Sequence, residues 1–319
     1  MNDNSLKFSL LVLNKLYLIM DLKTILALLC PLLVVSCGKE SLPISPERQD
    51  DMTVSFLGNI GPSTRATDSN FETGDAIGVF AIEKTSSNPD GDILTSNHAD
   101  NVKYSYSGGS FKGASTVIKQ ITFQRLMFYK AIYPYTSSAR NEFTFSVKTN
   151  QSYGDYYTLS DLMTADTEAT TEVTPHLVFS HKLSNIIINL KYEEKPGGSE
   201  QMFFNNVLVE AKANINENTF TAFGTTKTVI ASGNGNNSFK VILPPQTIAE
   251  KVTLITLKVG SKTEKVTLIT LKVGSKTFTF FPESDFIWKS GMQYTYDVTV
   301  SKAGIISFTS SINPWETDN

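Results

Sequence analysis

No stretch of twelve residues in this chain shows the periodicity of an amphipathic helix. Aromatic residues instead stand at alternating positions, threonine and serine are abundant, and turn residues recur at strand-length intervals. These patterns predict an all-β chain of two tandem β-sandwich domains, over residues 53–175 and 176–319. The acidic, threonine-rich stretch 166–174 is the expected linker between them.

Two segments near the start of the first domain have clear strand patterns. Residues 53–60, with the sequence TVSFLGNI, form the first expected strand, and a Gly-Pro-Ser-Thr break follows it. Residues 76–82 are densely apolar, which predicts a strand that is buried on both faces or lies in a sandwich core.

The chain begins with an expected export signal over residues 1–36, with Met20 as the expected true start. Its apolar run, Ile25 to Val35, is too short to span a hydrocarbon layer, which needs about 20 helical residues. Small Ser36 directly precedes Cys37, and this pattern resembles a bacterial lipobox. We expect Cys37 to be lipidated and residues 37–52 to form a tether. The alternative is a cleaved signal with an incidental cysteine.

The charge and cysteine content exclude several classes of protein. The formal net charge is −3, and no basic block or aromatic-interleaved basic stripe occurs, so the sequence gives nucleic-acid binding little support. Of the two cysteines, Cys30 lies in the signal and Cys37 is the expected lipidation site, so no intramolecular disulfide is expected.

Residues 250–263 (EKVTLITLKVGSKT) are repeated without change as residues 264–277. Because solenoid repeats drift in sequence and recur three or more times, we interpret this pair as a recent duplication or an assembly error. A turn at Gly274-Ser275 places Leu271 opposite Phe278, whereas the same turn in the first copy places Leu257 opposite Glu264. We therefore expect one copy to join the sheet and the other to loop out or add an edge hairpin.

Residue patterns for catalysis or metal binding are missing from the sequence. His98, His176 and His181 are scattered without zinc-ligand spacing, and we expect His181 to be a structural, packed or hydrogen-bonded residue. Residues 88–92 (NPDGD) lack the spacing of a calcium loop, and no nucleophile elbow or phosphate-binding loop is present. We expect no cofactor, no metal and no enzymatic activity. Exposed tyrosines, Tyr153, Tyr156 and Tyr157, are candidates either for stacking on sugars or for sheet packing.

A series of ordered motifs resembles the fimbrillin-like (Mfa-like) lipoproteins of Bacteroides and Porphyromonas, the subunits of their fimbriae. The motifs are Thr64-Arg65-Ala66, Phe71 with Gly74–Phe80, Tyr133-Pro134-Tyr135, Asp161-Leu162-Met163, Phe179–Leu183, Leu243–Gln246, Trp288 with Gly291 and Tyr294–Tyr296, and Ile312–Trp315. The resemblance implies two β-sandwiches of transthyretin-like (Greek-key) topology, lipidation at Cys37 and assembly with other fimbrial subunits. Gly38-Lys39-Glu40 looks like a partial signal for export to the outer cell surface.

The resemblance also implies a processing site. In polymerising relatives, a trypsin-like protease cuts after an arginine beyond the first strand, and a strand from the next subunit fills the groove that is left. The cut is expected between Arg65 and Ala66; Arg48 is the other candidate, and a plain exposed linker is the alternative. The expected donor is a terminal strand, either Ile305–Thr309 or the segment through Trp315. Because only four residues follow Trp315, a tip, anchor or non-polymerising role is the alternative.

The expected function is therefore that of a structural and adhesive lipoprotein, anchored in the outer membrane at the cell surface or built into a fimbrium. The alternative is a surface-anchored module that does not polymerise and that binds a host glycan or protein.

Overall fold

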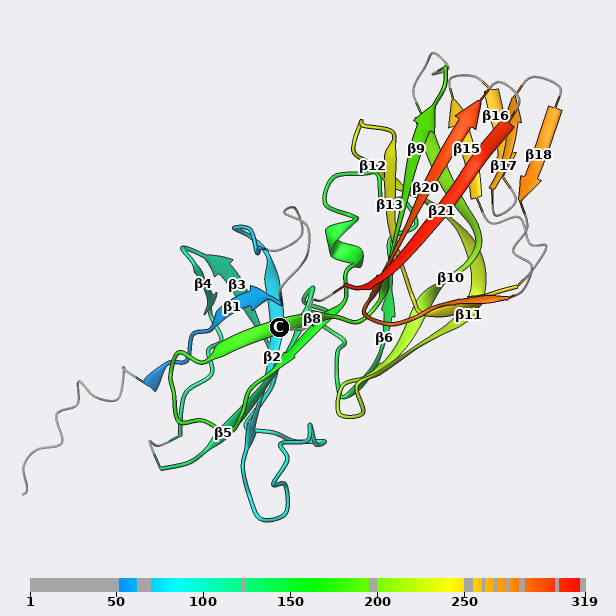
Figure 1. Cartoon of the computed structure of the whole chain (residues 1–319). Helices are drawn as coiled ribbons and strands as arrows, with labels where there is room; N and C mark the ends of the chain where they lie inside the picture. The colour runs from blue at the N-terminus through cyan, green and yellow to red at the C-terminus, as the bar shows by residue number, and fades with distance from the viewer. Residues whose placement is uncertain are drawn as a thin grey trace, which may run out of the picture. The chain divides into compact units, whose positions relative to one another are not determined.

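The computed structural model describes residues 52–61, 70–121, 124–194, 200–249, 255–259, 262–266, 269–273, 276–280, 285–301 and 304–315. This part of the chain is built of strands and contains no α-helix, which confirms the all-β prediction (Figure 1). One 3₁₀ turn, Thr158–Ser160, interrupts the strands. The strands are β1 (Leu57–Ile60), β2 (Ala76–Glu83), β3 (Ala99–Ser107), β4 (Ser110–Gly113), β5 (Met127–Tyr133), β6 (Glu142–Ser146), β7 (Met163–Asp166), β8 (His176–His181), β9 (Ser184–Tyr192), β10 (Glu200–Asn214), β11 (Thr219–Ile230), β12 (Ser232–Gly233), β13 (Ser238–Leu243), β14 (Gln246–Ile248), β15 (Ile255–Val259), β16 (Lys262–Val266), β17 (Ile269–Val273), β18 (Lys276–Phe280), β19 (Phe286–Trp288), β20 (Met292–Ser301) and β21 (Gly304–Pro314).

The first sheet has seven strands in the order β1-β8-β7-β5-β2-β3-β4. Its pairs are antiparallel except for β1 and β8, which run parallel. The central strand β2 is buried on both faces, as its apolar sequence predicts. Ile77, Val79 and Ala81 point to the core of the first sheet, whereas Phe80 and Ile82 belong to the core of the second half.

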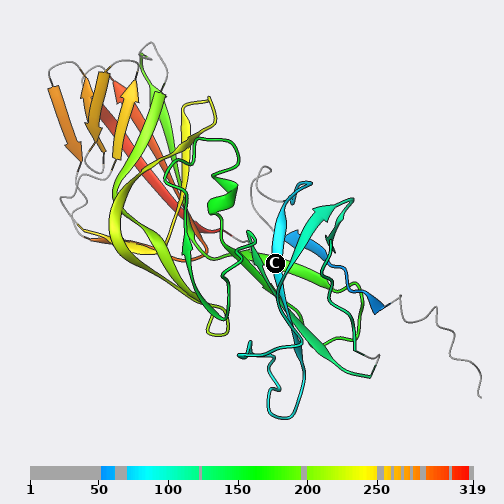
Figure 2. The ribbon, with the colours of Figure 1, turned by 180° about the vertical axis from the view of Figure 1, so that it is seen from behind.

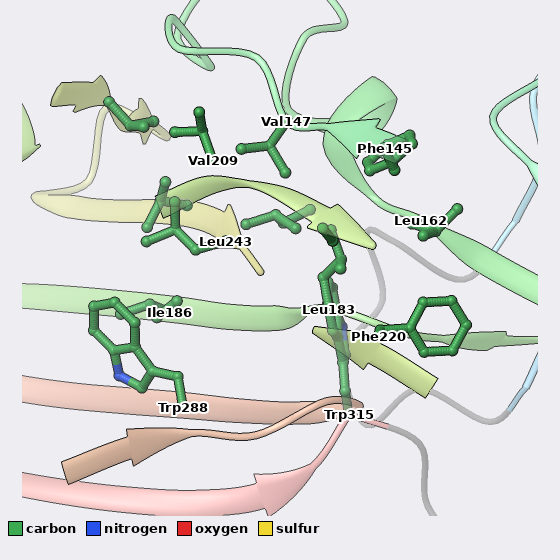
Figure 3. Close-up of a cluster of buried hydrophobic side chains, with 14 of the residues drawn as sticks. Phe145, Val147, Leu162, Leu183, Ile186, Val209, Phe220, Leu243, Trp288 and Trp315 are labelled. Carbon is green, nitrogen blue, oxygen red and sulfur yellow. The ribbon is translucent and has the colours of Figure 1, made fainter. Parts of the chain in front are cut away.

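The second half contains two larger sheets. One has the order β11-β10-β15-β16, with β6 also paired to β10, and the other has the order β12-β13-β9-β20-β21. Figures 1 and 2 show β9, β20 and β21 running side by side. Between these sheets lies a large apolar cluster, part of which, including Ile186, Leu243 and Trp288, is drawn in Figure 3. Two sheets enclosing one core fit a β-sandwich; the Greek-key topology stays a prediction.

The division between the two groups of sheets does not fall at the expected domain boundary between residues 175 and 176. Strand β8 follows that boundary but pairs with β1 and β7 in the first sheet, and β6 precedes it but pairs with β10. The expected linker, residues 166–174, instead connects β7 to β8 within one sheet, and Thr170 forms a bridge with Met127. The chain passes into the second half through Lys182 and Leu183, between β8 and β9.

The duplicated segment forms two hairpins in the registers that the sequence predicts. In the first, β15 pairs with β10 and with β16, and Leu257 stands opposite Glu264. In the second, β17 pairs with β18, and Leu271 stands opposite Phe278. One copy thus extends the sheet of β10, and the other contributes to a separate two-stranded sheet.

Candidate functional site

The candidate site is the seam at which the first sheet closes on itself. Residues 52–61, here called the seam strand, lie between β8 and the segment that carries β4 and Ile118. On one edge, Leu57–Ile60 pair in parallel with His176–Phe179, and the Gly61 N–H donates to the Phe179 carbonyl (2.8 Å).

The other edge of the seam strand is bonded as well. Phe56 and Phe111 exchange both backbone hydrogen bonds (3.1 and 2.8 Å). The Val54 N–H donates to the Ile118 carbonyl (2.9 Å), and the Gln120 N–H donates to the Met52 carbonyl (2.9 Å). The seam strand therefore closes the gap between the two ends of the sheet. Its removal would expose backbone donors and acceptors on both sides of that gap.

The side chains of the seam strand alternate between the core and the surface. Phe56 is fully buried (0% exposed), whereas its neighbour Leu57 is 44% exposed. The ring of Phe56 meets Tyr104 and Tyr129 edge-on, with centroids 5.0 and 5.2 Å away. Val54 and Ile60 are also buried, so the strand contributes three apolar side chains to the first core.

Two buried tyrosines fix the walls around the seam strand. The Tyr104 hydroxyl donates to the Val54 carbonyl (3.1 Å) and accepts from the Ile118 N–H (2.8 Å). The Tyr129 hydroxyl donates to Oε1 of Gln120 (2.9 Å). Burial raises the pKa of both phenols, and for Tyr129 the proximity of Tyr104 adds to the effect. The raised pKa values extend the pH range over which both phenols stay protonated to more alkaline pH.

The sequence-predicted site residues Cys37, Arg65 and Ala66 lie outside the described residues, as do the signal and all of the expected tether except Met52. The seam strand nonetheless ends at Gly61, shortly before Arg65 in the sequence. A chain cut after Arg65 would therefore no longer have the seam strand covalently attached to β2.

The three histidines are not brought together. His98 places Nε2 2.7 Å from the Lys119 carbonyl oxygen, and His176 is exposed at the start of β8. His181 is buried, with Nδ1 3.0 Å from Oδ1 of Asp161, which confirms its expected structural role. Within the described ranges, no group of three His, Cys, Asp or Glu side chains is arranged to hold a metal ion.

His181 also takes part in a contact that the sequence does not reveal. The ring of Trp315, which follows β21, stacks on the imidazole with centroids 3.9 Å apart and planes 4° apart. Trp315 is buried, and its backbone N–H donates to the Gly291 carbonyl (2.7 Å). The end of β21 is thereby fastened at the junction between β8 and β9. The only sequence signal was the presence of both residues among the ordered motifs.

A cleft of about 640 Å³ lies beside Tyr133. Tyr135, Tyr157, Asp75, Asp155 and Lys103 also line it. The Tyr133 hydroxyl donates to Oδ1 of Asp75 (3.0 Å), and burial, followed by this carboxylate, raises the pKa of the phenol. Of the tyrosines considered for sugar stacking, Tyr157 is buried in this wall, whereas Tyr153 is 65% exposed and packs edge-on against Tyr156.

The part of the chain that the structure describes contains no helix long and apolar enough to cross a bilayer.

Comparison with known proteins agrees with this architecture. A candidate fimbrium subunit of Bacteroides uniformis, Fim1C, is 24% identical over 312 residues, covering 92% of this chain and 95% of that protein. The crystal structure of a candidate cell adhesion protein from Bacteroides ovatus superimposes with a TM-score of 0.62 at 18% identity, covering 84% of this chain and 99% of that one. A second such structure, from Bacteroides uniformis, gives a TM-score of 0.56 at 25% identity, covering 83% and 100%. The family described as fimbrillin-like matches residues 64–315, and the chain therefore belongs to the fimbrillin-like family.

Proposed function

We propose that this protein is a structural and adhesive subunit of a fimbrium at the cell surface, exported as a lipoprotein that is lipidated at Cys37 and held in the outer membrane. Proteolysis between Arg65 and Ala66 then frees the seam strand, and a strand of another subunit takes its place. The observation that carries this proposal is the bonding of the seam strand on both of its edges.

The groove left by the seam strand has the properties that strand addition requires. Backbone groups of His176–Phe179 on one side and of Phe111 and Ile118 on the other are available to pair with an incoming strand. The space vacated by Phe56 lies between two aromatic rings, so an incoming apolar side chain replaces buried apolar area. Membership of the fimbrillin-like family and the likeness to Fim1C support the same assignment.

The test is N-terminal sequencing and mass determination of the protein recovered from intact cells, for the wild type and for Arg65→Gln. We expect a wild-type chain that begins at Ala66 and forms ladders resistant to sodium dodecyl sulfate. The Arg65→Gln chain is expected to keep its lipidated N-terminus at Cys37 and to form no ladder. Arg48→Gln is the matched control, because a cut there would leave the seam strand in place. Ladders formed by Arg65→Gln chains would refute the processing step.

A second candidate function is a surface-anchored binding module that does not polymerise and that holds a host glycan or protein. The cleft beside Tyr133, with its aromatic and carboxylate lining, is the observation that favours it. The intact lipoprotein would then bind its ligand saturably, and it would give neither a shortened N-terminus nor a ladder.

A further inference from the structure

The cleft beside Tyr133 is walled by strands of the first sheet and by the 3₁₀ turn Thr158–Ser160 with the residues around it. Its volume of about 640 Å³ lies within the range of about 300–1,000 Å³ that is usual for small-molecule sites. Ile60, the last residue of β1, also lines the cleft, so the cleft as described belongs to the uncut chain. The aromatic residues of its wall are Phe71, Tyr133, Tyr135 and Tyr157.

Two of these tyrosines are held firmly in the wall. The Tyr157 hydroxyl donates to Oδ1 of Asn185 (3.0 Å), and the Lys240 ammonium lies 3.9 Å from the centre of the Tyr157 ring. The Tyr133 hydroxyl donates to Oδ1 of Asp75 (3.0 Å). Because both rings are buried and hydrogen-bonded, they are fixed before a ligand arrives, which lowers the entropy cost of binding.

Hydrogen-bond acceptors are positioned in the cleft as well. Asp75 accepts from the Tyr133 hydroxyl through Oδ1 and from the backbone N–H of Glu72 through Oδ2 (2.8 Å). A carboxylate oxygen can accept about two hydrogen bonds, so each oxygen of Asp75 keeps one acceptor position for a ligand. The exposed carboxylate of Asp155 forms no hydrogen bond or ion pair within the described ranges, although its backbone carbonyl accepts from the Thr158 hydroxyl (2.8 Å).

Lys103, on β3, supplies hydrogen-bond donors. Its ammonium lies 5.4 Å from the centre of the Tyr135 ring, and an ammonium carries three N–H donors and no acceptor. This ammonium takes the position over Tyr135 that a ligand cation would take, and it repels a second positive charge. An anion is disfavoured too, because the lining has four carboxylates and one ammonium. The carboxylates belong to Glu72, Asp75, Asp155 and Asp161.

We propose that the cleft binds an uncharged sugar residue of a glycan and rejects glycans that end in an acidic sugar. A sugar hydroxyl both donates and accepts, so a sugar can bond to the carboxylates of Asp75 and Asp155 and to the Lys103 ammonium at once. A ligand ammonium only donates, and a ligand carboxylate only accepts. The apolar faces of a sugar ring suit the aromatic wall. This inference deepens and rests on the adhesive part of the proposed function, and it does not depend on processing at Arg65.

The test uses the full, uncut chain, because Ile60 lines the cleft. The protein is applied to an array of immobilised oligosaccharides. Neutral members end in galactose, mannose, fucose or N-acetylglucosamine, and matched acidic members end in sialic acid or a sulfated sugar. We expect binding to neutral members only. Isothermal titration calorimetry with the neutral oligosaccharide that binds best then gives the dissociation constants of the wild type and of variants.

Two substitutions with opposite effects on charge identify the chemistry of the ligand. Asp155→Asn removes a charged acceptor, and Lys103→Met removes the ammonium but keeps the apolar stem. Each should weaken binding at least ~10-fold, since each removes a hydrogen bond to a charged group. Asp90→Asn is the matched control and should change binding less than ~twofold, because Asp90 is exposed in a loop that does not line the cleft.

The sign of each change separates the possible ligands. Tighter binding by Lys103→Met would reveal a cationic ligand, and tighter binding by Asp155→Asn an anionic one; either result overturns the inference. Failure to bind any neutral oligosaccharide also overturns it and leaves a host protein as the ligand of the binding module. Neutral-glycan binding that neither substitution changes would show that the cleft is not the site, while the adhesive function would stand. The ladders and the N-terminal sequence test fimbrial assembly separately from all of these results.

Discussion

The substitution Phe56→Ala tests how much the seam strand contributes to the fold. Phe56 is fully buried, and its ring makes edge-on contacts with Tyr104 and Tyr129. Removing a buried phenylalanine ring costs about 3–5 kcal/mol, part of which comes from aromatic pairs worth about 0.5–1.5 kcal/mol each. We expect the free energy of unfolding of the uncut chain to fall by about 4 kcal/mol.

The matched control lies next to it on the same strand. Leu57 is 44% exposed, so Leu57→Ala removes roughly half the burial of a leucine and should cost about 1 kcal/mol. Urea denaturation of both variants, followed by circular dichroism, measures the difference. After a cut at Arg65, the seam strand of the Phe56→Ala variant should bind the rest of the chain more weakly by the same ~4 kcal/mol. Its dissociation constant should therefore rise about 10³-fold. Equal destabilisation by the two variants would refute the reasoning, because the strand would then not be anchored through its inward side chains.

Four further perturbations follow from the contacts described. Gly58→Val should destabilise the chain by about 1–3 kcal/mol through the clash with Phe111, whereas Asn59→Val on the outward face should change the urea midpoint little. Trp315→Ala should cost about 3–5 kcal/mol and speed proteolysis of β21, and Ile312→Ala, at an exposed position, should do neither. Deleting residues 264–277 places Phe278 opposite Leu257 in place of Glu264, so the melting temperature should stay the same or rise. Stability should be constant up to about pH 10 and fall above it, because the unfolded chain ionises its tyrosines there while the pKa values of Tyr104 and Tyr129 are raised in the fold; Tyr129→Phe should flatten this loss in alkaline denaturation.

Short sequence patterns predicted the features that depend only on neighbouring residues, such as strand position and hairpin register. The apolar run of β2 is buried on both faces, residues 57–60 form a strand within the expected range 53–60, and the hairpin registers of the duplicated segment are as expected. Each of these depends on side-chain period or turn position, and both can be read within about ten residues.

Long-range pairing was not predictable in the same way. Nothing in the sequence of β8 says that it pairs with β1 in parallel, or that the acidic stretch before it stays within the first sheet. The stacking of Trp315 on His181 joins residues more than a hundred positions apart, and its partners are fixed by the ends of β8 and β21. Such contacts follow from the packing of whole sheets, which residue period does not specify.

The placement of the seam strand also explains why proteolysis, and not simple association, would control the proposed assembly. While residues 52–61 are joined to β2, the seam strand competes for the groove as part of the same chain, at an effective concentration in the millimolar range. A donor strand from outside has no such advantage, even with the same inward side chains. Cutting at Arg65 changes neither Phe56 nor its aromatic neighbours, but it makes the rebinding of the seam strand dependent on concentration. Once the two strands compete on equal terms, the concentration of each strand decides which one occupies the groove. The Phe56→Ala variant should therefore accelerate assembly of cut protein while leaving uncut protein monomeric, and assembly of the uncut variant would contradict this account.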